Sequence, residues 1–218
     1  MTLALERPVV LAVDGAVHGD LVVAPGAAGI VVFAHGSGSG RLSPRNRQVA
    51  AAFQHAGLAT LLFDLLTPSE GERDERTHEL RFDIPFLAGR LRQVEAWVGS
   101  KPEVARLPLG YFGASTGAAA ALVAASGDAT VRAIVSRGGR PDLARAEVLE
   151  AVHAPTLLIV GALDTAVIEM NRWALSRLGA TEKDLVIVPG ATHLFEEPGT
   201  LEEVARLASD WFARHLAT

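Results

Sequence analysis

Short apolar runs of strand length alternate along the chain with longer stretches in which apolar residues recur at helical spacing. The runs are rich in Val, Ile, Leu and Phe, and Gly, Pro or Asp marks most of their boundaries. The predicted strands are residues 8–13, 20–24, 30–34, 58–63, 108–112, 131–136, 156–160 and 185–188. The predicted helices are residues 44–56, 84–98, 116–125, 142–152, 167–178 and 201–216. This order predicts right-handed crossovers onto a mostly parallel sheet.

The first two predicted strands differ from the others, because only a short loop, residues 14–19, separates them. Such a loop is typical of a hairpin and predicts an antiparallel edge. Residues 30–34 and 157–160 are apolar throughout, as expected for strands that helices cover on both faces. The sequence therefore predicts an α/β fold with eight strands, an antiparallel N-terminal edge and helices on both faces. We expect a single domain over residues 1–218.

One stretch, residues 67–81, is irregular and carries charges of both signs. Its charged residues are Glu70, Glu72, Arg73, Asp74, Glu75, Arg76, Glu79 and Arg81. The pattern predicts a solvated loop. Because it follows the carboxyl end of a predicted strand, the alternative is that it forms one wall of a site.

The amino-acid composition excludes several classes of function. With 49% hydrophobic residues and a net charge of −5, the chain is neither disordered nor a polycation suited to nucleic acid. It has no cysteine, which excludes disulfides, thiolate metal sites and a cysteine nucleophile. The N-terminus lacks a signal-peptide pattern, and the longest apolar run, residues 118–125, is too short to cross a membrane. We expect a cytoplasmic monomer or homodimer that acts on a small molecule without metal or cofactor.

A candidate nucleophile lies in the sequence Gly113-Ala-Ser-Thr-Gly117, which matches G-x-S-x-G. Ser115 follows a predicted strand and precedes a predicted helix, the context in which a sharp turn exposes a nucleophilic serine. Glycines two residues before and after remove collisions at such a turn. The alternative is that Ser115 only caps the helix, but a cap explains neither glycine.

A serine hydroxyl needs a base to take its proton and a carboxylate to orient that base. On this architecture the acid and then the histidine should each follow a later strand. Asp164 follows residues 156–160, and His193 follows residues 185–188 in a Gly-containing loop. Asp164 also precedes a helix, which leaves the alternative of a helix cap. Asp64, at the end of an earlier strand, is the reserve candidate for the acid.

The glycine-rich segment after residues 30–34, His35-Gly-Ser-Gly-Ser-Gly40, is predicted to help bind the negative charge that develops in acyl transfer. We expect one donor from the N–H of Thr116 and the second from Ser37, with Gly38 as the alternative. His35 is expected to fix this loop. A dinucleotide-binding role is the competing interpretation, but Arg41 or Ser43 occupies the position where G-x-G-x-x-G requires its last glycine.

These motifs together resemble the dienelactone hydrolase-related group of α/β-hydrolases over nearly the whole chain. The matching segments are residues 35–40 (HGSGSG), 57–66 (GLATLLFDLL), 113–117 (GASTG), 161–164 (GALD) and 190–193 (GATH). The resemblance implies Ser115 as nucleophile, Asp164 as orienting acid and His193 as base. Dienelactone hydrolases proper use cysteine, so the serine favours a carboxylesterase over a lactone hydrolase. Similar domains also occur fused to phosphoribosyltransferases, but no such domain fits within 218 residues.

The family's cap domains usually follow the strand that ends here near residue 136, where only residues 137–140 precede the next element. We therefore expect an open site for short to medium esters, cleaved through an acyl-enzyme intermediate. Arg137 and Arg140 are candidates for holding a substrate carboxylate, the alternative being local ion pairs such as one with Asp142. Two functional alternatives remain: a dienelactone or lactone hydrolase, and a binding scaffold without catalysis.

Overall fold

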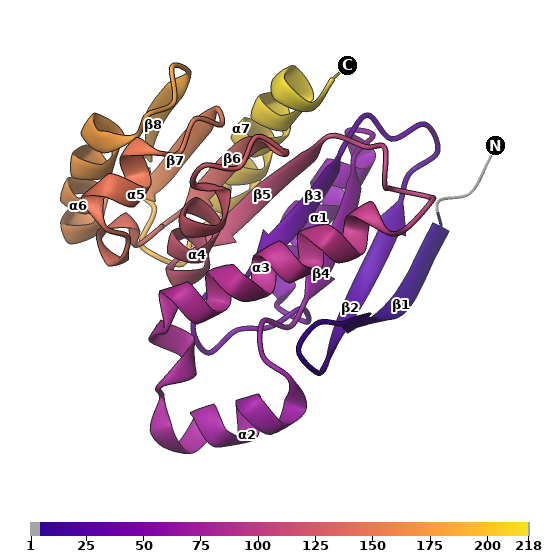
Figure 1. Cartoon of the computed structure of the whole chain (residues 1–218). Coiled ribbons are helices and arrows are strands. Elements are labelled where there is room, and N and C mark those ends of the chain that lie inside the picture. The colour runs from indigo at the N-terminus through magenta and orange to yellow at the C-terminus, as the bar shows by residue number, and fades with distance from the viewer. Residues whose placement is uncertain (1–4, 218) are drawn as a thin grey trace.

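The computed structural model describes residues 5–217 and contains one eight-stranded sheet in the order β1-β2-β4-β3-β5-β6-β7-β8 (Figure 1). The strands are β1 (Leu5–Ala12), β2 (Ala16–Val23), β3 (Ile30–Ala34), β4 (Ala59–Phe63), β5 (Leu109–Ala114), β6 (Val131–Arg137), β7 (Thr156–Gly161) and β8 (Lys183–Val188). The α-helices are α1 (Pro44–His55), α2 (Pro68–Thr77), α3 (Ile84–Gly99), α4 (Thr116–Ala125), α5 (Ala146–Glu150), α6 (Thr165–Arg177) and α7 (Thr200–Leu216). Two 3₁₀ turns are η1 (Leu80–Phe82) and η2 (Pro141–Leu143).

The predicted antiparallel edge is confirmed. β1 pairs antiparallel with β2, and β2 pairs antiparallel with β4, whereas the remaining pairs are parallel. β2 alternates exposed and buried residues over much of its length, while β3, β4, β5 and β7 are buried at every position. The central strands are apolar throughout because helices cover both of their faces.

Helices lie on both sides of the sheet, with α3 and α4 in front and α1 and α7 behind in the view of Figure 1. Two large core clusters fill the layers, one beneath α3 and α4 and one beneath α1 and α7, and a small third cluster lies between β7 and α6. In the second, the rings of Phe33, Phe53 and Phe112 meet with centroids 5.0–5.6 Å apart. The carboxyl ends of the parallel strands β3 to β8 meet at one edge of the sheet, where ligands bind in open α/β sheets.

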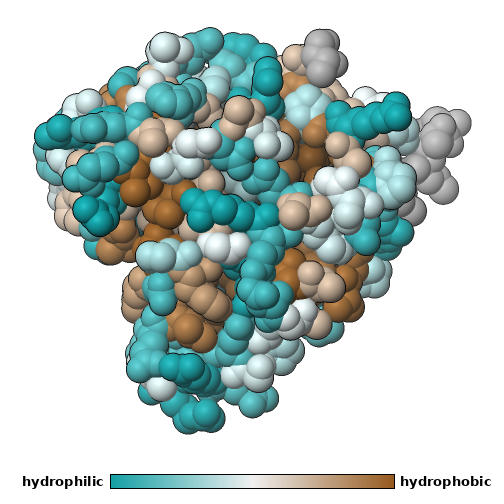
Figure 2. Space-filling view, viewed as in Figure 1, coloured by the Kyte–Doolittle hydropathy of each residue, from teal (hydrophilic) through white to brown (hydrophobic). Residues whose placement is uncertain are grey.

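The prediction of a solvated loop over residues 67–81 is wrong, because this segment forms α2 and η1. Thr67 accepts a hydrogen bond from the Glu70 N–H, and the Glu70 carboxylate accepts one from the Thr67 N–H. This capping box, with Pro68 in the first helical turn, starts the helix. The buried Arg90 of α3 also binds Glu70 at 2.7 Å and anchors α2 to the body. Figure 2 shows α2 as a mostly hydrophilic projection at the bottom of the view.

The predicted helix over residues 142–152 is also longer than the observed one. The segment forms η2 and then only five residues of helix, α5, whose N-cap, Arg145, provides no side-chain hydrogen bond. An uncapped start leaves the first N–H groups of the helix without partners. β1 and β2, in contrast, begin earlier than predicted, at Leu5 and Ala16, because their hydrogen-bonded register continues through polar positions and up to the pair of Ala12 and Ala16. The predicted loop over residues 14–19 is therefore shorter, residues 13–15.

No cap domain is inserted into the fold within residues 5–217. Over the same residues, no helix combines the length and the apolar character that crossing a membrane requires.

Candidate active site

Ser115 occupies the turn between β5 and α4 with φ 50° and ψ −120°, a conformation that side chains rarely adopt. A Cβ at Gly113 would lie 2.4 Å from the Ala118 Cα, and one at Gly117 would lie 2.2 Å from the Ala34 oxygen. Both glycines are therefore required by close backbone packing, as predicted. The Ser115 side chain makes no capping hydrogen bond, so the alternative of a simple helix cap is wrong.

The structure brings Ser115, His193 and Asp164 together, although they lie on three separate loops. The His193 Nδ1 is 2.5 Å from the Asp164 Oδ2, and its Nε2 is 3.3 Å from the Ser115 Oγ. Because the carboxylate is an acceptor, Nδ1 carries the proton and the Nε2 lone pair faces the serine hydroxyl.

The two alternatives for the acid are not supported. Asp164 stands at the N-cap of α6 but makes no side-chain capping bond. The reserve acid, Asp64, accepts a hydrogen bond from the Arg41 N–H at 2.9 Å and forms an ion pair with the Arg41 guanidinium at 3.2 Å. Asp64 therefore fixes the segment before α1, and the side-chain partners of His193 within residues 5–217 are Asp164 and Ser115.

Tight backbone contacts hold the loops of Asp164 and His193 against one another. The N–H of Leu163 donates to the Ala191 oxygen at 3.0 Å, and a Cβ at Gly161 would lie only 2.4 Å from that same oxygen. The Glu197 carboxylate accepts hydrogen bonds from the N–H and hydroxyl of Thr192. The positions of the acid and the imidazole are thus set before any substrate binds.

On the other side of Ser115, the loop after β3 packs directly on the nucleophile, since a Cβ at Gly36 would lie 3.2 Å from the Ser115 Cβ. The Ser37 N–H donates to the Thr116 Oγ1 at 2.9 Å. Thr116 opens α4, so its own N–H has no preceding helical turn to bond with. The two predicted donors, Ser37 and Thr116, therefore lie side by side. Gly38, the alternative donor, has a left-handed φ of 69° in the same loop.

His35 joins this loop to the neighbouring strand. Its Nε2 accepts a hydrogen bond from the Leu65 N–H at 3.0 Å, and its Nδ1 donates to the Gly36 oxygen at 2.9 Å. Burial lowers the pKa of His35, outweighing the opposing effects of the Gly36 oxygen and Asp64. The ring is therefore neutral and uses both nitrogens to fix the loop.

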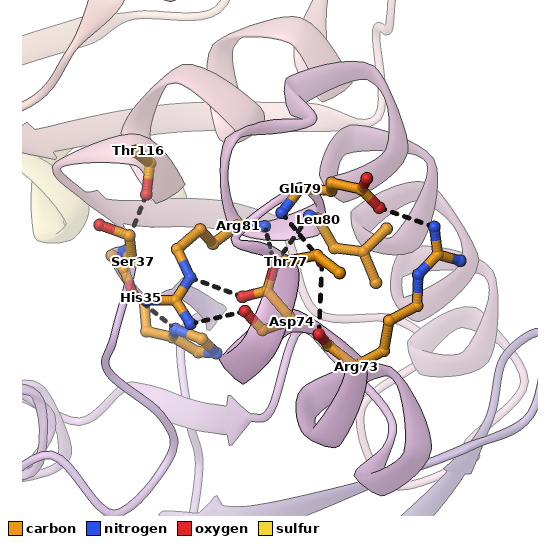
Figure 3. A network of polar contacts seen from close by, with 10 residues as sticks. His35, Ser37, Arg73, Asp74, Thr77, Glu79, Leu80, Arg81 and Thr116 are labelled. Carbon is orange, nitrogen blue, oxygen red and sulfur yellow. Dashed lines mark hydrogen bonds and ion pairs between the residues drawn. The ribbon is translucent and has the colours of Figure 1, made fainter.

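A cavity of about 410 Å³ opens beside Ser37 and Thr116 and is closed on its far side by residues of α2 and η1. Among these, the nearly buried Asp74 accepts hydrogen bonds from the Leu80 N–H and from the Arg81 N–H and guanidinium. Figure 3 shows Arg81 reaching toward Asp74 with Ser37 and His35 nearby. Residues 67–81 therefore line a cavity next to the two predicted donors, in agreement with the alternative that this segment forms one wall of the site.

The two arginines predicted to bind substrate have different surroundings. Arg140 forms two hydrogen bonds of 2.8 Å with the Asp142 carboxylate, the local ion pair given as the alternative. These bonds raise the pKa of Arg140. Arg137 is 8% exposed, and its Nη1 has no hydrogen-bond partner among the described residues. Burial and the nearby charge of Arg45 lower the pKa of Arg137 to about 10.

Some residues near the site were not predicted from the sequence. The ion pair between Asp74 and Arg81 was not predicted, because residues 67–81 were interpreted as a loop. A signal for a helix was present, however, in the T-x-x-E pattern from Thr67 to Glu70 that follows a strand. Arg45 carries no comparable signal, because only the fold places it beside Arg137.

Comparisons with known proteins place this geometry in context. A crystal structure of a dienelactone hydrolase from Anabaena variabilis ATCC 29413 is 56% identical, with a TM-score of 0.95, and the alignment covers 99% of this chain and 100% of that one. The esterase Est1E from Butyrivibrio proteoclasticus is 16% identical, with a TM-score of 0.80 over 97% of this chain and 99% of that one, and shows the shared fold. No family model matches the chain.

Two proteins from different strains of Mycobacterium tuberculosis, both named "putative phosphoribosyl transferase", are 59% identical over 201 residues. The match covers 92% of this chain but only 44% of either relative, so the chain spans less than half of their length. The dienelactone hydrolase match, in contrast, extends over both chains from end to end. With its mostly parallel sheet and its elbow at Ser115, this chain belongs to the dienelactone hydrolase-related group of the α/β-hydrolase superfamily.

Proposed function

We propose that this hydrolase cleaves carboxylic esters through an acyl-enzyme intermediate on Ser115. The observation that carries the proposal is the position of His193, whose two ring nitrogens contact the Ser115 Oγ and the Asp164 carboxylate. This is the arrangement that converts a serine hydroxyl into a nucleophile.

In the proposed reaction, the Ser115 Oγ attacks the ester carbon while the His193 Nε2 takes the hydroxyl proton. Asp164 holds the Nδ1 proton and stabilises the imidazolium that forms. His193 then protonates the leaving alcohol as the C–O bond breaks. A water molecule, activated by the same imidazole, releases the acid from Ser115.

The negative charge on the substrate oxygen would be bound by the N–H groups of Thr116 and Ser37. The first lacks a helical acceptor, and the second is held beside it by the Thr116 hydroxyl at 2.9 Å. The incoming oxyanion, a stronger acceptor than a hydroxyl, competes for the Ser37 N–H. The acyl group would extend into the cavity of about 410 Å³ that begins at these two residues. Its size favours short to medium acyl chains.

A second substrate class, a lactone, has one specific observation in its favour: the 56% identical structure is that of a dienelactone hydrolase. A lactone is a cyclic ester, so the same steps open it and the leaving alcohol remains attached to the acyl group. Comparing kcat/KM for a small lactone and for an open ester of equal carbon number distinguishes the two substrate classes.

Substitution of the nucleophile tests the proposal. Ser115→Ala should lower kcat for p-nitrophenyl acetate by about 10⁴- to 10⁶-fold, because the attacking oxygen is lost. Its circular dichroism spectrum should match that of the wild type. Ser176→Ala, on the exposed face of α6, is the matched control and should retain full activity. Undiminished turnover by folded Ser115→Ala would refute the assignment. A folded wild-type protein with no esterase or lactonase activity would favour a binding scaffold.

A further inference from the structure

Helix α2 turns one side toward the cavity beside the proposed oxyanion donors. The residues of α2 that line this cavity are Pro68, Gly71, Asp74 and Glu75. They recur every three or four positions, which places them on one side of the helix. Arg73, on the opposite side, is exposed to solvent. A side chain at position 71 would therefore extend toward the cavity, and glycine leaves this part of the wall without one.

Neither the backbone nor the packing requires glycine at position 71. Gly71 lies outside the left-handed region that favours glycine, and a Cβ there would meet no atom within 4 Å. Apart from proline, glycine is the least favourable residue in a helix interior. Gly113 and Gly117, in contrast, have backbone atoms within 2.4 Å of the place where a Cβ would lie. What glycine preserves at position 71 is thus the volume of the cavity.

Polar contacts hold α2 in place. The helix contains no Val, Ile, Leu, Met or aromatic residue. The buried Arg90 of α3 donates hydrogen bonds of 2.7 and 2.9 Å to the Glu70 carboxylate and one of 2.6 Å to the Val13 oxygen. Further along the helix, Asp74 is paired with Arg81 at 2.6 Å. Because α2 is anchored at two points, the fold sets the distance from the proposed donors to this wall.

The position of the cavity indicates which part of an ester it accepts. In the proposed reaction His193 gives its proton to the leaving oxygen, so the leaving group lies on the His193 side of Ser115. The residues that line the cavity come from β2, α3, α4 and the segments after β3 and β4. Within residues 5–217, none of them belongs to the loops that carry Asp164 and His193. The acyl group is therefore the part that extends into the cavity.

The lining also indicates the chemistry of the acyl group. Leu65 and Leu87, each 2% exposed, provide an apolar surface. The nearly buried carboxylate of Asp74 is neutralised by the guanidinium of Arg81. The more exposed polar residues of the lining include His18, Asp64 and Glu75. A buried apolar surface with paired charges suits an uncharged aliphatic chain.

We propose that Gly71 sets the length of the acyl chain that the cavity accepts, and that the preferred substrates are esters of uncharged, unbranched acids longer than acetate. This inference rests on the proposed function, because it places the ester carbonyl at the donors Ser37 and Thr116. From there the chain extends toward α2, and each methylene that enters the cavity gains apolar contact.

A series of p-nitrophenyl esters, from acetate through butyrate and hexanoate to octanoate, tests the inference. In the wild type, kcat/KM should rise from acetate to hexanoate. Gly71→Leu should lower kcat/KM for the hexanoate by about 10- to 100-fold, since one methylene excluded from an apolar pocket already costs about 10-fold or more. The acetate, which does not reach α2, should change by less than about threefold. Equal losses for all acyl chains, or a wild type that prefers acetate, would overturn the inference.

Gly71→Ala and Gly89→Ala form a matched pair, because each replaces a helical glycine whose Cβ would meet no atom within 4 Å. Both substitutions should raise the melting temperature by about 1–4 °C, since alanine favours a helix. Only Gly71→Ala should lower the activity toward long acyl chains relative to acetate. If Gly71→Leu does not fold, this pair decides the inference: identical chain-length profiles for the two alanine variants would contradict it.

A second series varies the alcohol instead, with ethyl, butyl and hexyl acetate. Gly71→Leu should leave the relative kcat/KM values of these esters unchanged, because their alcohols lie on the His193 side of Ser115. A loss confined to the long alcohols would show that the cavity holds the leaving group, and would refute the assignment of the acyl chain to it.

A binding measurement separates this inference from the proposed function. In Ser115→Ala, hexanamide should raise the melting temperature more than acetamide does, and Gly71→Leu on that background should remove the difference. A wild type that hydrolyses no ester refutes the proposed function, whereas this binding pattern would still support a pocket of defined length for an acyl chain. Equal shifts with the two amides, or a difference that persists in Gly71→Leu, would count against the role of Gly71.

Discussion

The two flanks of Ser115 are built differently. On the β3 flank, the polar groups named above pair within the chain: His35 uses both ring nitrogens, Ser37 donates to Thr116, and Asp74 accepts from Arg81. On the β6 flank, the Ser136 Oγ, the Arg137 Nη1 and the Asn171 Oδ1 are buried without partners among the described residues. The β6 flank therefore has more buried polar atoms without hydrogen-bond partners among the described residues than the β3 flank, where the Arg41 Nε also makes no hydrogen bond.

This difference suggests different roles for the two flanks in the proposed reaction. A wall with paired groups keeps the proposed oxyanion donors in place without a ligand, which is how preorganised sites stabilise developing charge. Buried polar atoms without partners, in contrast, are rare in folded proteins and mark places where a ligand or water completes the structure. In the proposed reaction, the β3 flank would therefore bind the developing negative charge, while His193 would move the proton from the other side of Ser115.

The largest expected effect comes from adding one methyl group to the β3 flank. In Gly117→Ala the new Cβ would lie 2.2 Å from the Ala34 oxygen and 2.4 Å from the His35 oxygen, both backbone atoms that cannot rotate away. The free energy of unfolding, measured with urea, should fall by about 3 kcal/mol or more. Gly89→Ala in α3 is the control, because its Cβ meets no atom within 4 Å, and it should raise stability by about 0.5–1 kcal/mol. Similar stability of the two variants would contradict the close packing.

A smaller effect is expected from the hydroxyl that links the two donor segments. Thr116→Val removes the acceptor of the Ser37 N–H while keeping the side-chain shape. The loop should lose its alignment, and kcat for p-nitrophenyl acetate should fall by about 10-fold, or ~1.4 kcal/mol, with little change in KM. Thr116→Ser should restore kcat. A loss in KM alone, or no rescue by serine, would show that Thr116 only fills space.

The smallest effect concerns pH. Because burial lowers the pKa of His35 below that of the unfolded chain, only the unfolded chain binds this proton between the two values. Stability from this group is complete above about pH 6.5 and declines as the pH falls below it. Urea unfolding of the wild type should therefore lose more stability from pH 7 to pH 5 than that of His35→Gln. The pKa of His215 is also lowered, but His215 is present in both proteins and contributes equally to their loss of stability. Equal losses would mean that His35 is not held neutral.

The sequence predicted the sheet and the three residues of the proposed reaction because both leave local signals. Apolar runs identify buried strands, and the glycines around Ser115 and the Gly-containing loop of His193 follow directly from such runs. Helix α2 also had a signal, the capping box at Thr67, but its many charges favoured a loop. The different states of Arg137 and Arg140 had none, since a missing partner is a property of the packed molecule.

Labelling of the nucleophile tests the central claim most directly. A fluorophosphonate probe reacts covalently with an activated serine, and mass spectrometry of the digested protein identifies the residue. We predict one adduct, on Ser115, whose formation slows sharply in His193→Ala and is unaffected in Ser176→Ala. An adduct on another residue, or no adduct on folded wild-type protein, would contradict the account.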